Sequence, residues 1–125
     1  MMTPLLQVAL GGAIGASARY LTGNAVTRAL GHGFPAGTMV VNVLGSILMG
    51  VLVVVLARKG GQAAAPFLMT GVLGGFTTFS AFSLDAVTLF ERGQIGTASG
   101  YVVGSVVLSL LGFLGGLFVA RMVLA

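Results

Sequence analysis

The chain has 125 residues, of which only six are Lys or Arg and two are Asp or Glu. About a quarter of the residues in an average soluble domain are charged, so this composition excludes an ordinary soluble globular protein. Hydrophobic residues make up 57% of the chain, and its mean hydropathy is +1.10. A fold with so much apolar surface needs lipid to cover it, so the sequence predicts an all-α membrane protein in contact with the lipid bilayer.

Charged residues and Gly- and Pro-rich turns divide the chain into stretches that are long enough to cross a bilayer, which takes about 20 apolar residues. We therefore expect a single transmembrane domain, residues 1–125, with helices at about 4–22, 37–57, 66–90 and 97–121. No basic segment precedes the first apolar run, and glycines interrupt it. We interpret it as a helix of the mature protein rather than a cleaved signal peptide.

Positive charge does not select one orientation of these helices in the membrane. Lys and Arg normally concentrate on the cytoplasmic side. Here Arg58, Lys59 and Arg121 lie on the side of the termini, and Arg28 and Arg92 lie on the opposite side. Arg19 lies near the end of the first helix, so the basic residues divide almost evenly. A chain without a bias is expected to insert both ways, so that two copies can pair antiparallel. The alternative is a single orientation imposed by other features.

Small residues recur at helical spacing in the last span, at Gly96, Gly100, Gly104, Gly112 and Gly116. Such a stripe lets another helix backbone approach closely. We expect these glycines to serve helix packing and assign them no ligand.

Few residues are available for enzyme chemistry. The chain has no Cys, a single His (His32) and two carboxylates, Asp85 and Glu91. Neither a metal cluster nor a nucleophile–base–acid triad can be assembled from them, so we expect a protein that is not an enzyme. The scattered basic residues also lack the interleaved aromatic residues of a nucleic-acid-binding surface.

Neutral hydrogen-bonding residues form two tracks at i, i+4 and i+8 spacing, Thr38, Asn42 and Ser46 in the second span and Tyr101, Ser105 and Ser109 in the fourth. Each track lies on one helix face. Hydroxyl groups can bond to carbonyls of their own helix, so either track can serve packing alone. The amide of Asn42 cannot be satisfied in this way and needs a partner helix, water or a ligand.

The third span contains the adjacent glycines Gly74 and Gly75, followed by the β-branched pair Thr77 and Thr78. These residues disfavour a helix in the middle of a long uncharged stretch, so we expect the helix to break in mid-membrane. Backbone carbonyls freed by a break suit a small hard cation such as Na⁺.

Beyond the expected break, Phe79 and Phe82 share a helix face beside the hydroxyls of Ser80 and Ser83. The rings either fill the core or turn the positive edges of their quadrupoles toward an anion. Arg19 also has two interpretations. It either extends to the membrane interface or faces a water-filled vestibule, where its charge raises the local anion concentration.

Four motifs follow in order along the chain: GASARY at 15–20, GTMVVNVLG at 37–45, GGFTTFSAFS at 74–83, and the Tyr and Ser track of the fourth span. Over essentially its whole length the sequence resembles the Fluc (CrcB) family of fluoride ion channels. The resemblance implies an antiparallel, dual-topology homodimer in the plasma (inner) membrane, with two fluoride pores and one structural Na⁺ at the dimer centre. It also implies passive F⁻ export that relieves fluoride toxicity in the cytoplasm.

Carried over by motif position, the resemblance implies that the carbonyls of Gly74 and Thr77 hold the Na⁺ and that Arg19 lies in the vestibule. The residues that it implies for the fluoride pore are Asn42, Phe79, Phe82, Ser80, Ser83, Tyr101, Ser105 and Ser109. Two positions depart from the family pattern. Asp85 stands where many members carry Glu, and we assign it no role. Phe113 stands where another hydroxyl would extend the track, which we therefore end at Ser109.

Two other classes of protein have a similar size and helix number. A small dual-topology multidrug-type exporter relies on a glutamate in its first helix, whereas the first span here has no acidic residue. A non-transporting membrane subunit would account for the glycine stripes, but it leaves Asn42 and the expected break unexplained.

Overall fold

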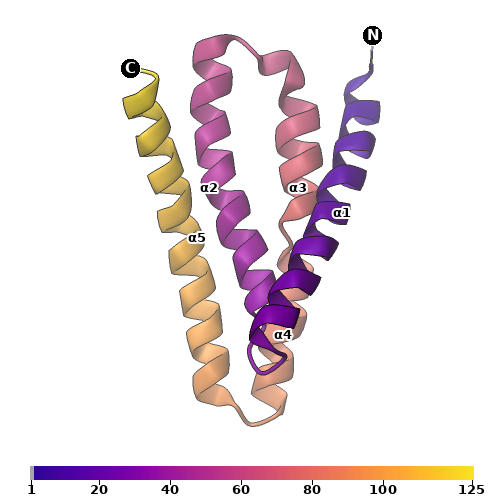
Figure 1. The fold of residues 1–125 in the computed structure, drawn as a ribbon, viewed down its shortest axis with the longest axis vertical. Helices are drawn as coiled ribbons and strands as arrows, with labels where there is room; N and C mark the ends of the chain where they lie inside the picture. The colour runs from indigo at the N-terminus through magenta and orange to yellow at the C-terminus, as the bar shows by residue number, and fades with distance from the viewer. Residues whose placement is uncertain (1) are drawn as a thin grey trace.

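The computed structural model describes residues 2–125, which form an all-helical fold with short connections (Figure 1). The elements in chain order are α1 (Pro4–Leu30), α2 (Ala36–Lys59), η1 (Gln62–Ala64), η2 (Pro66–Leu73), α3 (Gly74–Phe76), α4 (Phe79–Glu91) and α5 (Ile95–Val123). Because η2, α3 and α4 follow one another closely, we treat them together as the third segment. The fold of residues 2–125 then has four long helical segments: α1, α2, the third segment and α5. The all-α prediction is confirmed.

Helix α1 extends well beyond the predicted end at residue 22. It begins at Pro4, where the Thr3 hydroxyl accepts a hydrogen bond from the Leu6 amide at 3.2 Å. It ends only at Gly31, whose positive φ of 84° and hydrogen bond to the Thr27 oxygen stop the helix. The predicted bound at residue 22 allows only the length that crosses a bilayer, whereas Gly23 does not stop the helix and the Gly- and Pro-containing turn begins only at Gly31.

The other long segments differ little from their predicted bounds. Helices α2 and α5 begin and end within two residues of 37–57 and 97–121. The third segment starts as a π-helix at Pro66, and the helical turn η1 precedes it.

Three segments are long and apolar enough to cross a membrane: residues 36–59, 62–91 and 95–123. Helix α1 is not among them. Gln7, Arg19 and the polar residues of its last turns lower its apolar character. That residues 4–22 also span the membrane stays a prediction.

The helical segments pack in pairs, with α2 along α5 and α1 along η2 and α3. Glycines allow both contacts. A Cβ added to Gly50 of α2 would lie 2.9 Å from the Leu117 nitrogen, and one added to Gly71 would lie 2.8 Å from the Cα of Gly11. Of the predicted stripe, Gly112 and Gly116 face α2 closely, whereas a Cβ at Gly96 or Gly100 would meet open space.

The third segment is interrupted between α3 and α4. Thr77 and Thr78 have extended backbone, with φ and ψ of −89° and 159° and of −151° and 121°. The chain resumes as helix α4 at Phe79, where the Thr78 hydroxyl accepts a hydrogen bond from the Ala81 amide at 3.1 Å. The interruption falls at the residues whose propensities disfavour a helix.

Both termini lie at one end of the fold, together with the connection between α2 and the third segment (Figure 1). The connections α1–α2 and α4–α5 lie at the other end. At the first end, Arg58 Nη1 donates to the Leu124 oxygen at 2.9 Å and joins the end of α2 to the end of α5.

Candidate functional site

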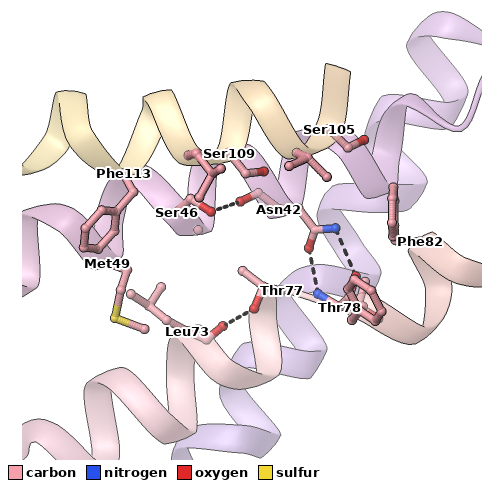
Figure 2. Close-up of a pocket in the computed structure, with 14 residues that line it drawn as sticks. Asn42, Ser46, Met49, Leu73, Thr77, Thr78, Phe82, Ser105, Ser109 and Phe113 are labelled. Atoms are coloured by element: carbon pink, nitrogen blue, oxygen red, sulfur yellow. Dashed lines mark hydrogen bonds between the residues drawn. The ribbon is translucent and has the colours of Figure 1, made fainter. Parts of the chain in front are cut away.

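A groove of about 360 Å³ lies between α2, α5 and the interrupted third segment (Figure 2). Met49 and Phe113 stand at one end of it, and Phe82 and Ser105 at the other (Figure 2). Its polar lining consists of the amide and hydroxyl side chains of Asn42, Ser46, Thr77, Thr78, Ser105 and Ser109. Among the described residues, none that lines this groove carries an ionisable side chain.

Asn42 of α2 binds the interruption through both ends of its amide. Its Nδ2 donates to the Thr78 oxygen at 3.0 Å, and its Oδ1 accepts from the Thr78 nitrogen at 2.7 Å (Figure 2). The side-chain amide thus makes the pair of hydrogen bonds with the extended Thr78 backbone that a neighbouring β-strand would make. Within residues 2–125, Nδ2 makes no other hydrogen bond, so its second N–H is available to a ligand in the groove that Asn42 lines.

Some of the backbone carbonyl oxygens before the interruption accept a hydrogen bond, and others lack the donor that a continuous helix would provide. The Leu73 oxygen accepts from both the nitrogen and the hydroxyl of Thr77, each at 3.0 Å. A continuous helix would satisfy the Gly74 oxygen with the Thr78 nitrogen, but that nitrogen donates to Asn42 instead. In residues 2–125 the Gly74 oxygen is therefore left without its helical donor.

Aromatic rings continue from the groove toward α5. Phe79 and Phe82 have ring centroids 5.5 Å apart, and Phe82 lies 5.3 Å from Tyr101. Phe82 is nearly buried, whereas Phe79 is 78% exposed on the outside of the single chain. The Phe79 ring is thus only partly enclosed by its own chain.

The hydroxyls of α5 have different environments. Ser105 is buried, and its Oγ has no hydrogen-bond partner within the described chain. Ser109 lines the groove beside it. Tyr101 is fully buried behind Phe82 and donates to Asp85 Oδ2 at 3.0 Å, so it stands outside the groove lining. Ser105 is the α5 hydroxyl that is buried and unpaired.

Several residues of the predicted site lie outside the groove lining. The Ser83 hydroxyl donates to the Phe79 oxygen at 2.9 Å, and the Ser80 hydroxyl lies 3.4 Å from that of Thr78. Arg19 Nε donates to the Gly75 oxygen at 3.0 Å. In the second span, Ser46 lines the groove but donates its hydroxyl to the Asn42 oxygen of its own helix.

Thr78, which the sequence names only as part of the expected break, is the main residue of the site that no predicted role covers. It lines the groove, receives the Asn42 amide and caps α4. A Thr directly before a helix is a common N-cap, so its position between the expected break and the resumed helix was the signal available. Gly45, Leu73 and Phe113 line the groove as well, with no chemical signature of their own.

No group of three or more His, Asp or Glu side chains in residues 2–125 is placed to hold a metal ion. Any cation at this site would depend on neutral backbone oxygens. The free Gly74 oxygen is of the chemical type that Na⁺ prefers.

The apolar segments and the neutral, polar-lined groove define a multi-pass helical membrane protein whose site suits binding rather than covalent chemistry. The chain belongs to the CrcB family, because the model described as "CrcB-like protein, Camphor Resistance (CrcB)" matches residues 6–117. This finding confirms the resemblance seen in the sequence motifs.

Curated relatives named "Fluoride-specific ion channel FluC" match nearly the whole chain. The protein of Cereibacter sphaeroides is 68% identical over 121 residues, and that of Paracoccus denitrificans is 59% identical, each match covering 97% of both chains. The protein of Agrobacterium fabrum is 49% identical over 96% of this chain and 98% of its own. These relatives are ion channels, so the family is not one of enzymes.

Proposed function

We propose that the protein is a fluoride-selective ion channel that lets F⁻ leave the cytoplasm down its electrochemical gradient. The observation that carries this proposal is the groove beside the interrupted helix, whose polar groups are all neutral. The names of relatives up to 68% identical to this chain support the choice of fluoride.

The chemistry of the groove suits a small, strongly hydrated anion. Fluoride leaves water only where donors replace its hydration shell. The free N–H of Asn42 and the unpaired hydroxyl of Ser105 are such donors, and the edges of Phe79 and Phe82 add weaker positive potential. Without a fixed charge in the lining, an anion binds weakly enough to move on.

A channel of this kind protects the cell without an energy source. HF crosses membranes uncharged and ionises in the more alkaline cytoplasm. A negative inside potential then drives the trapped F⁻ outward through an open pore. We therefore place the protein in the plasma (inner) membrane, where it relieves fluoride toxicity.

We further propose that all four helical segments cross the membrane and that the interruption lies at mid-membrane depth. An interrupted backbone is tolerated there only where protein buries it or where it lines a polar cavity. The hydrogen bonds of Asn42 to Thr78 and the groove beside them provide both conditions.

The working unit that we propose is an antiparallel, dual-topology homodimer. The nearly equal division of Lys and Arg between the two ends of the fold supports insertion in both directions. The exposed Phe79 ring and the open glycines Gly96 and Gly100 leave surface for a second copy. In such a dimer a partner would enclose the Phe79 ring that this chain leaves exposed.

We propose that one structural Na⁺ lies at the centre of this dimer, held by the carbonyls of Gly74 and Thr77 from both copies. The free Gly74 oxygen beside the extended Thr77 supports this assignment. The cation would compensate backbone dipoles that the interruption leaves unpaired. Thermal denaturation in Na⁺ against N-methylglucamine tests it, since only a specific site makes stability depend on the cation.

A drug exporter is the less favoured alternative, because α1 carries no acidic residue and the relatives are named as fluoride channels. The experiment that decides is fluoride-electrode recording from liposomes that contain the purified protein. Addition of a K⁺ ionophore is expected to release fluoride rapidly without a proton gradient. Release only when a proton gradient is imposed would point to an exporter, and no release from folded protein would contradict the proposal.

A further inference from the structure

Arg19 provides a donor that the interruption of the third segment removes. In a continuous helix the Gly75 oxygen would accept from the Phe79 nitrogen, four residues later. Phe79 instead begins α4 beyond the extended pair Thr77 and Thr78. The Gly75 oxygen accepts from Arg19 Nε at 3.0 Å, so a side chain of α1 replaces the missing backbone donor.

The packing of α1 brings Arg19 to this position. A Cβ on Gly75 would lie 2.7 Å from the Gly12 oxygen, and one on Gly15 would lie 2.9 Å from the Phe76 nitrogen. The backbones of α1 and α3 are therefore in direct contact. Arg19 lies one turn after Gly15 on the same helix face, and its half-buried side chain reaches the end of α3.

The interruption is thus held from both sides by different helices. Arg19 of α1 fixes the Gly75 carbonyl before it, and Asn42 of α2 fixes Thr78 after it. The guanidinium is also suited to the carbonyl end of a helix, where the partial charge is negative. Between these two anchors lies the Thr77 peptide group, next to the Gly74 oxygen that has lost its helical donor.

We propose that Arg19 is a positioning residue, which sets the direction of the Gly75 peptide group and through it the backbone from Gly74 to Thr78. This role differs from that of a vestibule charge that only attracts anions. The inference concerns the same interruption that the proposed function uses. Its first test needs no ion flux, so the two proposals can fail separately.

The first test is hydrogen–deuterium exchange of the reconstituted protein with Arg19→Gln. Loss of a charge-assisted hydrogen bond is expected to raise exchange at residues 76–80 by about tenfold or more, while α2 and α5 stay protected. Arg28→Gln is the matched control, because it removes the same charge from the exposed end of α1 and is expected to leave exchange unchanged. Unchanged exchange in Arg19→Gln would overturn the proposal.

Fluoride saturation provides the second readout. A displaced interruption lowers the maximal rate of efflux, and more fluoride does not restore it. A residue that only concentrates anions would change the half-saturating fluoride concentration and leave the maximal rate intact, which would also overturn the proposal.

Arg19→Lys keeps the charge but loses the planar guanidinium, and it serves if Arg19→Gln does not fold. Positioning predicts that Arg19→Lys still shows faster exchange at residues 76–80 and a reduced maximal rate. Full restoration of both by Lys would mean that charge alone matters. If the wild-type protein passes no fluoride, the channel proposal fails, and the exchange result still decides the role of Arg19.

Discussion

Asn42 and Thr78 form a pair of hydrogen bonds in which one side-chain amide satisfies both backbone groups of one residue. The donor distance from Nδ2 to the Thr78 oxygen is 3.0 Å, and the Thr78 nitrogen lies 2.7 Å from Oδ1 (Figure 2). This pairing gives the interrupted segment a partner that a helix cannot give it. It also turns a polar residue of α2 into part of the groove wall.

Replacement of this amide is expected to affect stability and ion flux together. Asn42→Ala leaves the nitrogen and oxygen of Thr78 without partners, at a cost of about 1–3 kcal/mol in the free energy of unfolding. Fluoride efflux from liposomes should fall to background. Gln62→Ala, which removes an amide from the exposed turn η1 outside the groove lining, is the control and should change neither quantity.

A second substitution separates the two roles of Asn42. Asn42→Asp keeps an acceptor for the Thr78 nitrogen but places a carboxylate beside the path of an anion. Efflux should be lost although a larger part of the stability is retained. Normal efflux in Asn42→Asp would contradict the assignment of Asn42 to the pore.

Ser105 offers the opposite pattern, a loss of flux without a loss of stability. Its hydroxyl is buried and makes no hydrogen bond within the described chain, so Ser105→Ala removes an unsatisfied group. The melting temperature should stay the same or rise while fluoride efflux falls. Ser99→Ala, on the exposed side of α5, should leave efflux unchanged. A large fall in the melting temperature of Ser105→Ala would show that its role is structural.

The ring of Phe82 is predicted to act on the ion as well as on packing. Phe82→Ile keeps an apolar side chain between Phe79 and Tyr101 but removes the ring edge. Efflux should fall by up to about tenfold, the scale of a single aromatic interaction, while the protein stays folded. Phe90→Ile, which changes an exposed ring outside the groove, is the control. Full efflux in both Phe82→Ile and Phe79→Ile would show that these rings serve packing only and do not interact with the ion.

Orientation in the membrane can be measured with a single cysteine, because the natural chain has none. Gln94 lies in the exposed connection between α4 and α5, so Gln94→Cys adds a reactive thiol at one end of the fold. An impermeant maleimide should label about half of the molecules in intact cells and all of them after permeabilisation. Labelling of all or none in intact cells would contradict dual topology.

The sequence predicted those parts of the fold that depend on local chemistry. Apolar stretches separated by charged turns predicted α2 and α5 to within two residues at each end. The Gly and Thr residues from Gly74 to Thr78 indicated where a helix would be unfavourable, and the backbone is extended at Thr77 and Thr78. Helix α1 continues past residue 22 and ends only before Gly31, because the lone Gly23 lowers the helix propensity without stopping a helix that packs against its neighbours.

Contacts between distant residues could not be predicted in the same way. The spacing of Thr38, Asn42 and Ser46 placed them on one face of α2, but it did not indicate that the Asn42 amide would bind Thr78. Likewise, Arg19 contacts a carbonyl 56 residues further along the chain. Such contacts depend on how closely glycines let α1 approach the third segment, which is a property of the packed fold.

The most direct test of the central claim, that a groove lined by neutral groups conducts fluoride selectively, is a competition experiment. Liposomes that contain only the purified chain are loaded with equal concentrations of fluoride and chloride, and ion-selective electrodes record both ions after a K⁺ ionophore is added. We predict rapid release of fluoride with chloride retained at the level of protein-free liposomes. Equal release of both ions, or no release of fluoride by folded protein, would contradict the account.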